Sequence, residues 1–213
     1  MKSIYETVLG EEFNRLHPML QKKFGVHSQS SYAVRGKGEM EVIQGGSRLI
    51  RLLSWIGVPI KLSFPERGAC VPFTIFNEAY KNAYGLECVS WKRNFFFPVA
   101  VRSFDAVMKE GESAFLIQDD FGKGGFLTAA LSFQVTKEGG LLIRSENTSL
   151  QIGGKTILLP KQLGIKASVL EEYDVDKEMI RIHVHLYQPW FGTVLMYKGN
   201  VQTDFPEKER GSR

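Results

Sequence analysis

The sequence predicts a mainly β protein: an antiparallel β-barrel or strongly curled sheet of about nine or ten strands, with N-terminal helices and one inserted amphipathic helix. Three observations predict this fold class. Residues 126–152 alternate apolar and polar side chains on both sides of a Lys-Glu-Gly-Gly turn, which is typical of a hairpin with one apolar face. The same alternation continues through most of the chain after residue 69. A sheet of this size tends to close, because closure removes exposed edges.

The length of the chain bounds the number of domains. It has 213 residues, 43% of them hydrophobic, which is enough to bury a real core. Because no linker, repeat or low-complexity segment interrupts the pattern, we expect one domain over residues 1–205. Residues 206–213 are mostly charged and are expected to form a disordered tail.

Charge and cysteine content exclude some classes of partner and compartment. The net charge is +4 and the basic residues are spread along the chain, so we expect solvated surface charge and no nucleic-acid partner. Cys70 and Cys88 are too far apart in sequence for a metal knuckle; they are expected to be reduced, or to face each other on paired strands. With no signal-peptide pattern and no long apolar run, we expect a soluble, cytoplasmic protein.

Residues 3–24 are expected to form the N-terminal helices. Ser3 and Glu6 have the spacing of a capping box, and apolar residues then recur at helical spacing. Pro18 should divide the segment into two helices, and Gly25 should end the second. We expect this segment to pack on the sheet or to plug it.

A first strand is expected over 32–43, in which Gly36 and Gly38 indicate a bend or a close approach by another element. Residues 47–56 then form an amphipathic helix, with Ser47 as N-cap and Gly57 as C-cap. This helix carries Leu49, Leu53 and Trp55. Three roles stay open for it: docking on the sheet, covering a pocket as a lid, or peripheral membrane contact through 47–56.

The remainder of the chain is predicted to be strands and turns. Residues 156–164 are expected to be a short helix or loop, and residues 121–125 a glycine-rich turn. Alternating patterns predict strands over 71–80, 86–97, 99–109, 113–119, the 126–152 hairpin, 165–174, 179–187 and 193–202.

The strongest candidate for a binding site lies on the predicted 86–97 strand. Trp91, Arg93 and Phe95 alternate with polar residues and therefore share one apolar face. An arginine among aromatic side chains is costly unless it is paired or binds an anion. Arg93 is therefore expected either to anchor the acid or phosphate head of an apolar ligand, or to pair with a buried acid such as Glu87.

Catalytic and metal-binding patterns are weak. His183 and His185 point the same way from a strand and would need a third ligand to hold a metal, so a solvent-facing polar row is the alternative. The carboxylate pairs 119–120 and 171–172 are adjacent, so their members should point to opposite faces, which argues against paired acid–base work. We find no activated nucleophile and expect no cofactor.

Several short motifs occur in a fixed order along nearly the whole chain. They are the opening helix over 5–16, Gly36-x-Gly38, the 52–59 segment, Trp91-x-Arg93-x-Phe95, Leu159-Pro160 and Tyr197-Lys198-Gly199. In these features the chain resembles an uncharacterised bacterial domain family of unknown function, found alone or as a tail on reductases resembling saccharopine dehydrogenase. The resemblance implies no established activity. This chain departs from the fused members in having no Gly-x-Gly-x-x-Gly motif after a strand.

These observations favour a protein that binds rather than catalyses. The leading hypothesis is non-catalytic binding of an apolar or amphipathic small molecule, such as a lipid, in a barrel cavity. Arg93 with its aromatic neighbours would line the cavity, and Leu49, Leu53 and Trp55 would lie near its mouth. Two alternatives stay open: a module that docks on a reductase or membrane-associated partner, and a metal-dependent enzyme using His183 and His185. The oligomeric state is not predicted.

Overall fold

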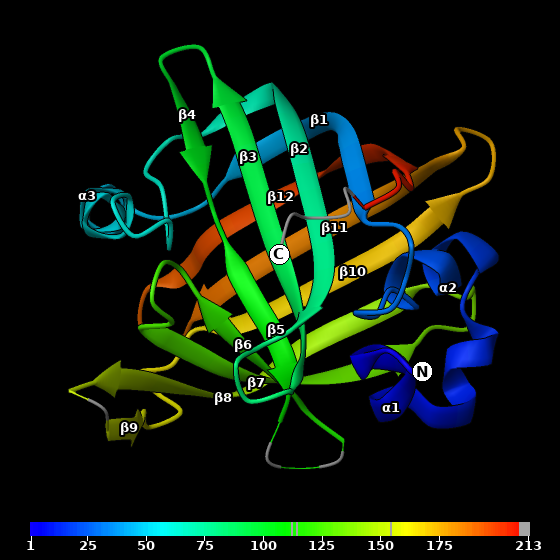
Figure 1. Cartoon of the computed structure of the whole chain (residues 1–213). Helices are drawn as coiled ribbons and strands as arrows, with labels where there is room; N and C mark the ends of the chain where they lie inside the picture. Colours follow the sequence, from blue (N-terminus) through cyan, green and yellow to red (C-terminus); the bar gives the residue numbers. More distant parts are fainter. Residues whose placement is uncertain (112, 114, 154, 209–213) are drawn as a thin grey trace.

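The structure is a computed structural model of the whole chain, and it describes residues 1–111, 113, 115–153 and 155–208. Ten of its strands form a closed antiparallel β-barrel (Figure 1), which confirms the predicted fold class. These strands are β1 (Val34–Gln44), β2 (Gly68–Lys81), β3 (Glu87–Phe97), β5 (Ala106–Glu110), β6 (Ile117–Phe121), β7 (Leu127–Val135), β8 (Leu141–Ile152), β10 (Lys166–Asp174), β11 (Met179–Gln188) and β12 (Gly192–Asp204).

Strand pairing mostly follows chain order, as expected for hairpin connections. Two exceptions close the barrel. β1 pairs with β12, joining the two ends of the chain, and β10 pairs with β8 from Ser168 opposite Arg144 to Glu171 opposite Leu141. Two short strands lie outside the barrel: β4 (Ala100–Ser103) pairs with the end of β3, and β9 (Lys155–Leu158) pairs with the end of β8.

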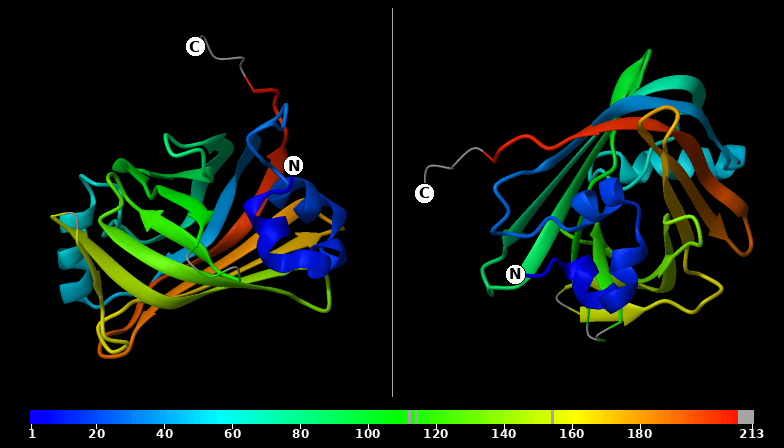
Figure 2. Two further views of the ribbon diagram at one scale, coloured as in Figure 1. Left: turned by 60° about the horizontal axis from the view of Figure 1, so that its bottom comes forward. Right: turned by 90° about the vertical axis from the view of Figure 1, so that its right-hand side faces the viewer.

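The N-terminal segment lies at one end of the barrel and fills it (Figure 2), which is one of the two arrangements expected from the sequence. It comprises α1 (Ile4–Leu9), a 3-10 helix η1 (Gly10–Arg15) and α2 (Pro18–Phe24). The capping box at Ser3 is present, and Gly25 caps α2. Figure 2 shows these helices at one end of the barrel and α3 (Arg48–Gly57) at the other. The apolar side of the plug is fully covered, in particular Ile4, Tyr5, Leu20 and Phe24.

The two glycines of β1 mark a close approach of backbones. A Cβ on Gly38 would lie 2.0 Å from the carbonyl oxygen of Asn200 on β12, closer than any side chain can sit. A Cβ on Gly199 of β12 would likewise lie 2.1 Å from the carbonyl oxygen of Glu39 on β1. Just beyond, a bulge between Met40 and Val42 shifts the register, so that Ile43 points into the core.

Three of the predicted elements differ from the structure. The expected 99–109 strand is two strands, β4 and β5, because Phe104 turns into the interior and its backbone N–H donates to the Arg93 carbonyl. The expected helix or loop over 156–164 begins as β9, which pairs with β8. The expected 113–119 strand starts only at β6, because residues 113 and 116 are joined by a turn hydrogen bond; residues 112 and 114 lie outside the described residues.

The C-terminal residues 206–208 follow the barrel. Glu207 forms a bridge with Tyr32, and Lys208 Nζ donates to the Ala79 carbonyl at 2.8 Å. Residues 209–213 lie outside the described residues, so the disorder of the tail stays a prediction. Among the described helices, none is long and apolar enough to cross a bilayer.

Candidate functional site

An apolar cavity of about 430 Å³ occupies the barrel end opposite the N-terminal plug. Its wall combines strand residues such as Ala129 and Leu195 with Leu53 of α3 and Trp190 of the β11–β12 turn. Leu53 and Trp190 are themselves exposed, so the cavity reaches the protein surface. This size and this apolar character are typical of small-molecule sites.

A smaller pocket of about 60 Å³ lies deeper in the barrel. It shares Phe104, Phe121 and Ala167 with the large cavity, so the two are adjacent. Three of the residues that line the inner pocket are charged, Arg93, Asp119 and Glu171, whereas the large cavity has one charged residue, Arg67, among its described lining residues. Its volume is enough for a few heavy atoms, such as those of a carboxylate group.

Arg93 lies between aromatic rings at the inner pocket. Its guanidinium carbon is 4.4 Å from the centre of the Phe104 ring and 5.8 Å from that of Trp91. These contacts stabilise the cation without using its N–H donors. The buried Nε and Nη2 atoms of Arg93 have no hydrogen-bond partner among the described residues. A buried charged donor in this state favours an anionic acceptor.

Asp119 lines the same pocket as Arg93 and is the acid that could pair with it. The two side chains form no ion pair within 4 Å. Burial raises the pKa of Asp119 to about 7, although the positive charge of Arg93 opposes this rise. Asp119 Oδ1 is also buried without a partner among the described residues. Arg93 and Asp119 therefore present two unsatisfied polar groups to one small pocket.

Several other polar groups behind the pocket pair with one another. Lys23 of α2 and Glu171 of β10 form an ion pair, each with only 2% of its side chain exposed. The indole N–H of Trp91 donates to the Tyr5 hydroxyl at 2.9 Å, and that hydroxyl donates to Met108 Sδ at 3.2 Å. Burial raises the pKa of Tyr5 well above its ordinary value. This layer joins the plug to the strands, and Arg93 Nε, Arg93 Nη2 and Asp119 Oδ1 take no part in it. The Arg93 side chain also lies beside the Tyr197 hydroxyl, where its charge opposes the rise in the pKa of Tyr197 that burial causes.

Helix α3 and the segment that follows it form one wall of the cavity mouth. Ser47 caps the helix as predicted, but Gly57 lies within it and Val58 is the C-cap, so the predicted end is wrong by one residue. Ile50 and Ser54 are buried beneath the helix, while most of its other apolar side chains are exposed.

Arg67 fixes this wall to the barrel. Its guanidinium donates to four backbone carbonyls, of Gly45, Phe64, Glu66 and Val194, at 2.7 to 3.1 Å. Burial lowers the pKa of Arg67 to about 10.

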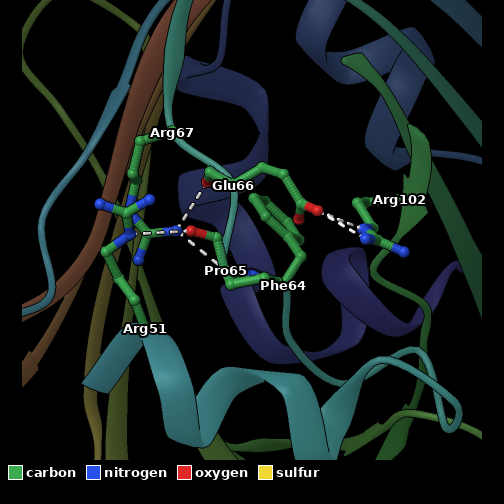
Figure 3. Close-up of polar contacts among 6 residues, drawn as sticks. All are labelled: Arg51, Phe64, Pro65, Glu66, Arg67 and Arg102. Atoms are coloured by element: carbon green, nitrogen blue, oxygen red, sulfur yellow. Dashed lines mark hydrogen bonds and ion pairs between the residues drawn. The ribbon is translucent and has the colours of Figure 1, made fainter. Parts of the chain in front are cut away.

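Two further arginines hold the same segment. Figure 3 shows Arg51 of α3 reaching the Pro65 carbonyl, at 3.1 Å, on the side where Arg67 also lies. The Glu66 carboxylate points the other way, to Arg102, which donates to it at 2.5 and 2.9 Å. The 58–67 segment is therefore held from both sides.

The structure brings together some of the residues predicted for the site and separates others. Trp91 and Arg93 line the inner pocket, and Leu53 lines the large cavity. Phe95 faces inward but packs in the core against Phe64 and Phe73. Leu49 and Trp55 lie on the exposed side of α3, where Trp55 stacks 5.0 Å below the Arg102 guanidinium.

Two predicted pairings have different outcomes. Glu87 does not pair with Arg93; it accepts a hydrogen bond from the Ser28 backbone N–H near the plug. The expected opposite orientation of Asp119 and Asp120 is confirmed, because Asp119 is buried while Asp120 pairs with Lys109 at 2.7 Å.

Sequence reasoning missed Asp119 and Glu171 as interior residues. A signal was present, because each lies midway between apolar residues of the same strand face: Ile117 and Phe121 flank Asp119, and Val169 and Tyr173 flank Glu171.

His183 and His185 lie outside the barrel interior. His183 is exposed opposite Lys198, and His185 Nε2 lies 2.9 Å from Thr193 Oγ1. In the described part of the chain, no three histidine, cysteine or acidic side chains are grouped to hold a metal ion.

Comparisons with known proteins place the chain in a family. It is 39% identical over 212 residues to the uncharacterized protein YndH of Bacillus subtilis (strain 168), and the match covers 100% of both chains. No solved structure matches significantly. The model of the domain of unknown function DUF4166 matches residues 16–201, and the chain belongs to this family.

Proposed function

We propose that this protein binds an amphipathic small molecule, with an apolar body and an acidic head, in the barrel cavity. One observation carries the proposal: an open apolar cavity of about 430 Å³ lies against a small pocket where buried N–H donors of Arg93 have no partner. In this arrangement the apolar body occupies the large cavity, and the acidic head accepts hydrogen bonds from Arg93. A lipid carboxylate has this chemistry.

The energetics favour this orientation over the reverse. Burying apolar ligand surface is favourable by roughly 25 cal/mol per Å², and it requires the apolar wall that the large cavity offers. An acidic head in the large cavity would meet only one charged side chain among the described lining residues, Arg67, whose donors are already bonded to backbone carbonyls. Arg93 is therefore the anion site, and its removal should affect acidic ligands selectively.

The test compares hexadecanoic acid with hexadecanol, using delipidated protein at pH 7 and displacement of a fluorescent apolar probe. Arg93→Met keeps most of the side-chain volume and removes the charge. Because a charge-assisted hydrogen bond contributes about 1.5–3 kcal/mol, we expect this variant to bind the acid roughly 10- to 100-fold more weakly. Binding of the alcohol should change little.

Lys92→Met is the matched control. Lys92 is the neighbour of Arg93 on β3 but is exposed on the outer face, so its loss should affect neither ligand. Equal weakening of acid and alcohol by Arg93→Met, in a variant with unchanged thermal unfolding, would contradict the anion site.

A protein-interaction module is the second candidate. The exposed apolar residues of α3 favour it, and so does the resemblance to tails on reductases. A module of this kind needs no hollow interior, whereas this barrel contains a large cavity. Pull-down with a saccharopine-dehydrogenase-like reductase from the same organism tests this candidate directly.

A further inference from the structure

Four segments far apart in sequence meet around the mouth of the large cavity. They are residues 45–67, 121–127, 150–167 except residue 154, and 188–194, here called the rim, and each segment contributes to the cavity wall. Hydrogen bonds join them: Lys123 N donates to the Ile60 carbonyl at 2.6 Å, and Gln188 Nε2 to the Gln162 carbonyl at 2.7 Å. The rim is therefore one continuous surface at the end opposite the N-terminal plug (Figure 2).

The rim exposes large apolar side chains from all four of its segments, including Phe126 of the 121–127 segment. Leu52 and Ile56 of α3 are 66% and 74% exposed, Leu158 of β9 is 63% exposed, and Trp190 of the β11–β12 turn is 67% exposed. The chain has three tryptophans, and two of them, Trp55 and Trp190, lie exposed on this surface. An apolar surface drawn from separate segments around an opening is typical of a docking surface.

The rim also concentrates positive charge. It contains eight arginines and lysines and one acid, Glu66, giving a formal charge of +7, whereas the whole chain carries +4. Arg102 and Asp105, which pair with Glu66 and Lys61 from outside the rim, cancel each other. The other rim cations with exposed side chains form no ion pair among the described residues; they are Arg48, Arg51, Lys123, Lys155, Lys161 and Lys166.

We infer that the rim docks on an anionic lipid bilayer, so that the cavity mouth faces the membrane. The inference rests on the proposed function, because it names the source from which the amphipathic ligand enters. Basic side chains interleaved with exposed tryptophan and aliphatic residues match an anionic headgroup layer above an apolar phase. The cavity opens within the same surface, so an amphipathic molecule passes between bilayer and cavity without crossing water.

Charge complementarity selects the bilayer over a purely apolar partner surface. Each lysine or arginine near an anionic membrane contributes about 1 kcal/mol, so the six rim cations without an ion pair would together provide most of the attraction. Helix α3 has ten residues and spans about 15 Å, so it lies flat in the headgroup region with Leu52 and Ile56 below it.

Vesicle flotation of the delipidated full-length chain tests the inference. The vesicles contain phosphatidylcholine alone, or phosphatidylcholine with about a third phosphatidylglycerol, at low and high salt. We expect binding to the anionic vesicles only, weakened by salt. The double variant Lys155→Gln/Lys161→Gln should lower the partition coefficient roughly 30-fold, at about 1 kcal/mol per lysine. Leu52→Ser/Ile56→Ser should lower it at least about 10-fold.

Matched controls change the same residue types away from the rim. Lys137→Gln lies in the exposed β7–β8 turn, and Tyr84→Ser in the exposed β2–β3 turn; both should bind vesicles as wild type does. The inference is overturned by equal binding to neutral vesicles, by no binding to either, or by rim variants that bind as wild type. It is also overturned if the rim instead joins two copies of the chain in ultracentrifugation.

A separate measurement keeps this inference distinct from the proposed function. The rim variants are titrated with hexadecanoic acid in solution, where no vesicle is present. Wild-type affinity in solution together with lost vesicle binding supports both proposals. If the wild-type chain binds the acid in solution but does not bind vesicles, the membrane inference is contradicted and the proposed function is not. Vesicle binding by a chain that does not bind the acid contradicts the proposed function and supports membrane docking alone.

Discussion

At the scale of single residues, the buried carboxyl group of Asp119 makes the stability of the barrel depend on pH. Its pKa in the folded protein is about 7, raised by burial, whereas an aspartate in an unfolded chain titrates near about 3.9. Between about pH 4 and pH 7 the folded state therefore holds a proton that the unfolded state has lost. Stability falls as pH rises through this window, by up to about 4 kcal/mol when it has been crossed.

Replacing Asp119 by asparagine should remove this dependence. Asp119→Asn has no charge to desolvate, so its free energy of unfolding relative to wild type should rise from pH 5 to pH 8. Urea unfolding across that range measures the difference, and other titrating groups cancel in the comparison. Asp176→Asn, on the exposed β10–β11 turn, is the control. A constant difference between Asp119→Asn and wild type would contradict the raised pKa of Asp119.

Residue patterns in the sequence predicted the inward-facing row of Trp91, Arg93 and Phe95, but not the partners of these side chains, and the interior positions of Asp119 and Glu171 were missed. The alternation around Arg93 predicted its apolar face because side-chain direction follows from strand period alone. The proposed partner Glu87 is on the same strand, six residues away, and a strand extends about 3.3 Å per residue. The acid that meets the inner pocket, Asp119, comes from β6, and only the pairing of strands determines that proximity.

At the scale of elements, α3 depends on the segment that follows it. Its buried residues are few, and Arg67 joins the end of the 58–67 segment to β12 through the Val194 carbonyl. The cavity wall at this point is therefore held by hydrogen bonds rather than by a packed core. Arg67 is the residue whose loss should loosen the mouth without changing the barrel.

Arg67→Met should increase amide hydrogen exchange in residues 47–66 while leaving the β1–β12 pairing protected. Four carbonyls lose their donor, and each unsatisfied buried carbonyl costs about 1–3 kcal/mol before relaxation. Hydrogen exchange read by mass spectrometry locates the effect, because local opening has its own free energy. Arg51→Met, which removes one bond to Pro65, should have a smaller effect on the same peptides. Uniform loss of protection over the whole barrel would show that Arg67 supports global stability instead.

Element boundaries were predictable where local chemistry determines them. The Ser3 capping box and the Pro18 break follow from neighbouring residues. The division of 99–109 into β4 and β5 does not. It arises because Phe104 leaves the strand face to pack against Arg93 and Phe121, and a long-range contact of that kind is absent from local alternation.

At the scale of the whole molecule, the barrel has two different ends. Apolar helices fill one end, and the other opens through a rim of basic and apolar side chains. The basic residues are dispersed in sequence, which suggested only solvated surface charge, and the fold then gathers eight of them around one opening. Charge patterning along a chain cannot reveal this, since barrel closure brings together segments more than a hundred residues apart.

The central claim is that the large cavity holds an amphipathic molecule, and native mass spectrometry of the chain after exposure to hexadecanoic acid tests it most directly. Ala129 has a small side chain in the cavity wall, so Ala129→Phe should fill that space while keeping the fold. We predict one bound acid per wild-type chain and none on the folded Ala129→Phe variant. Equal binding by both, or no bound acid on the wild-type chain, would contradict the account.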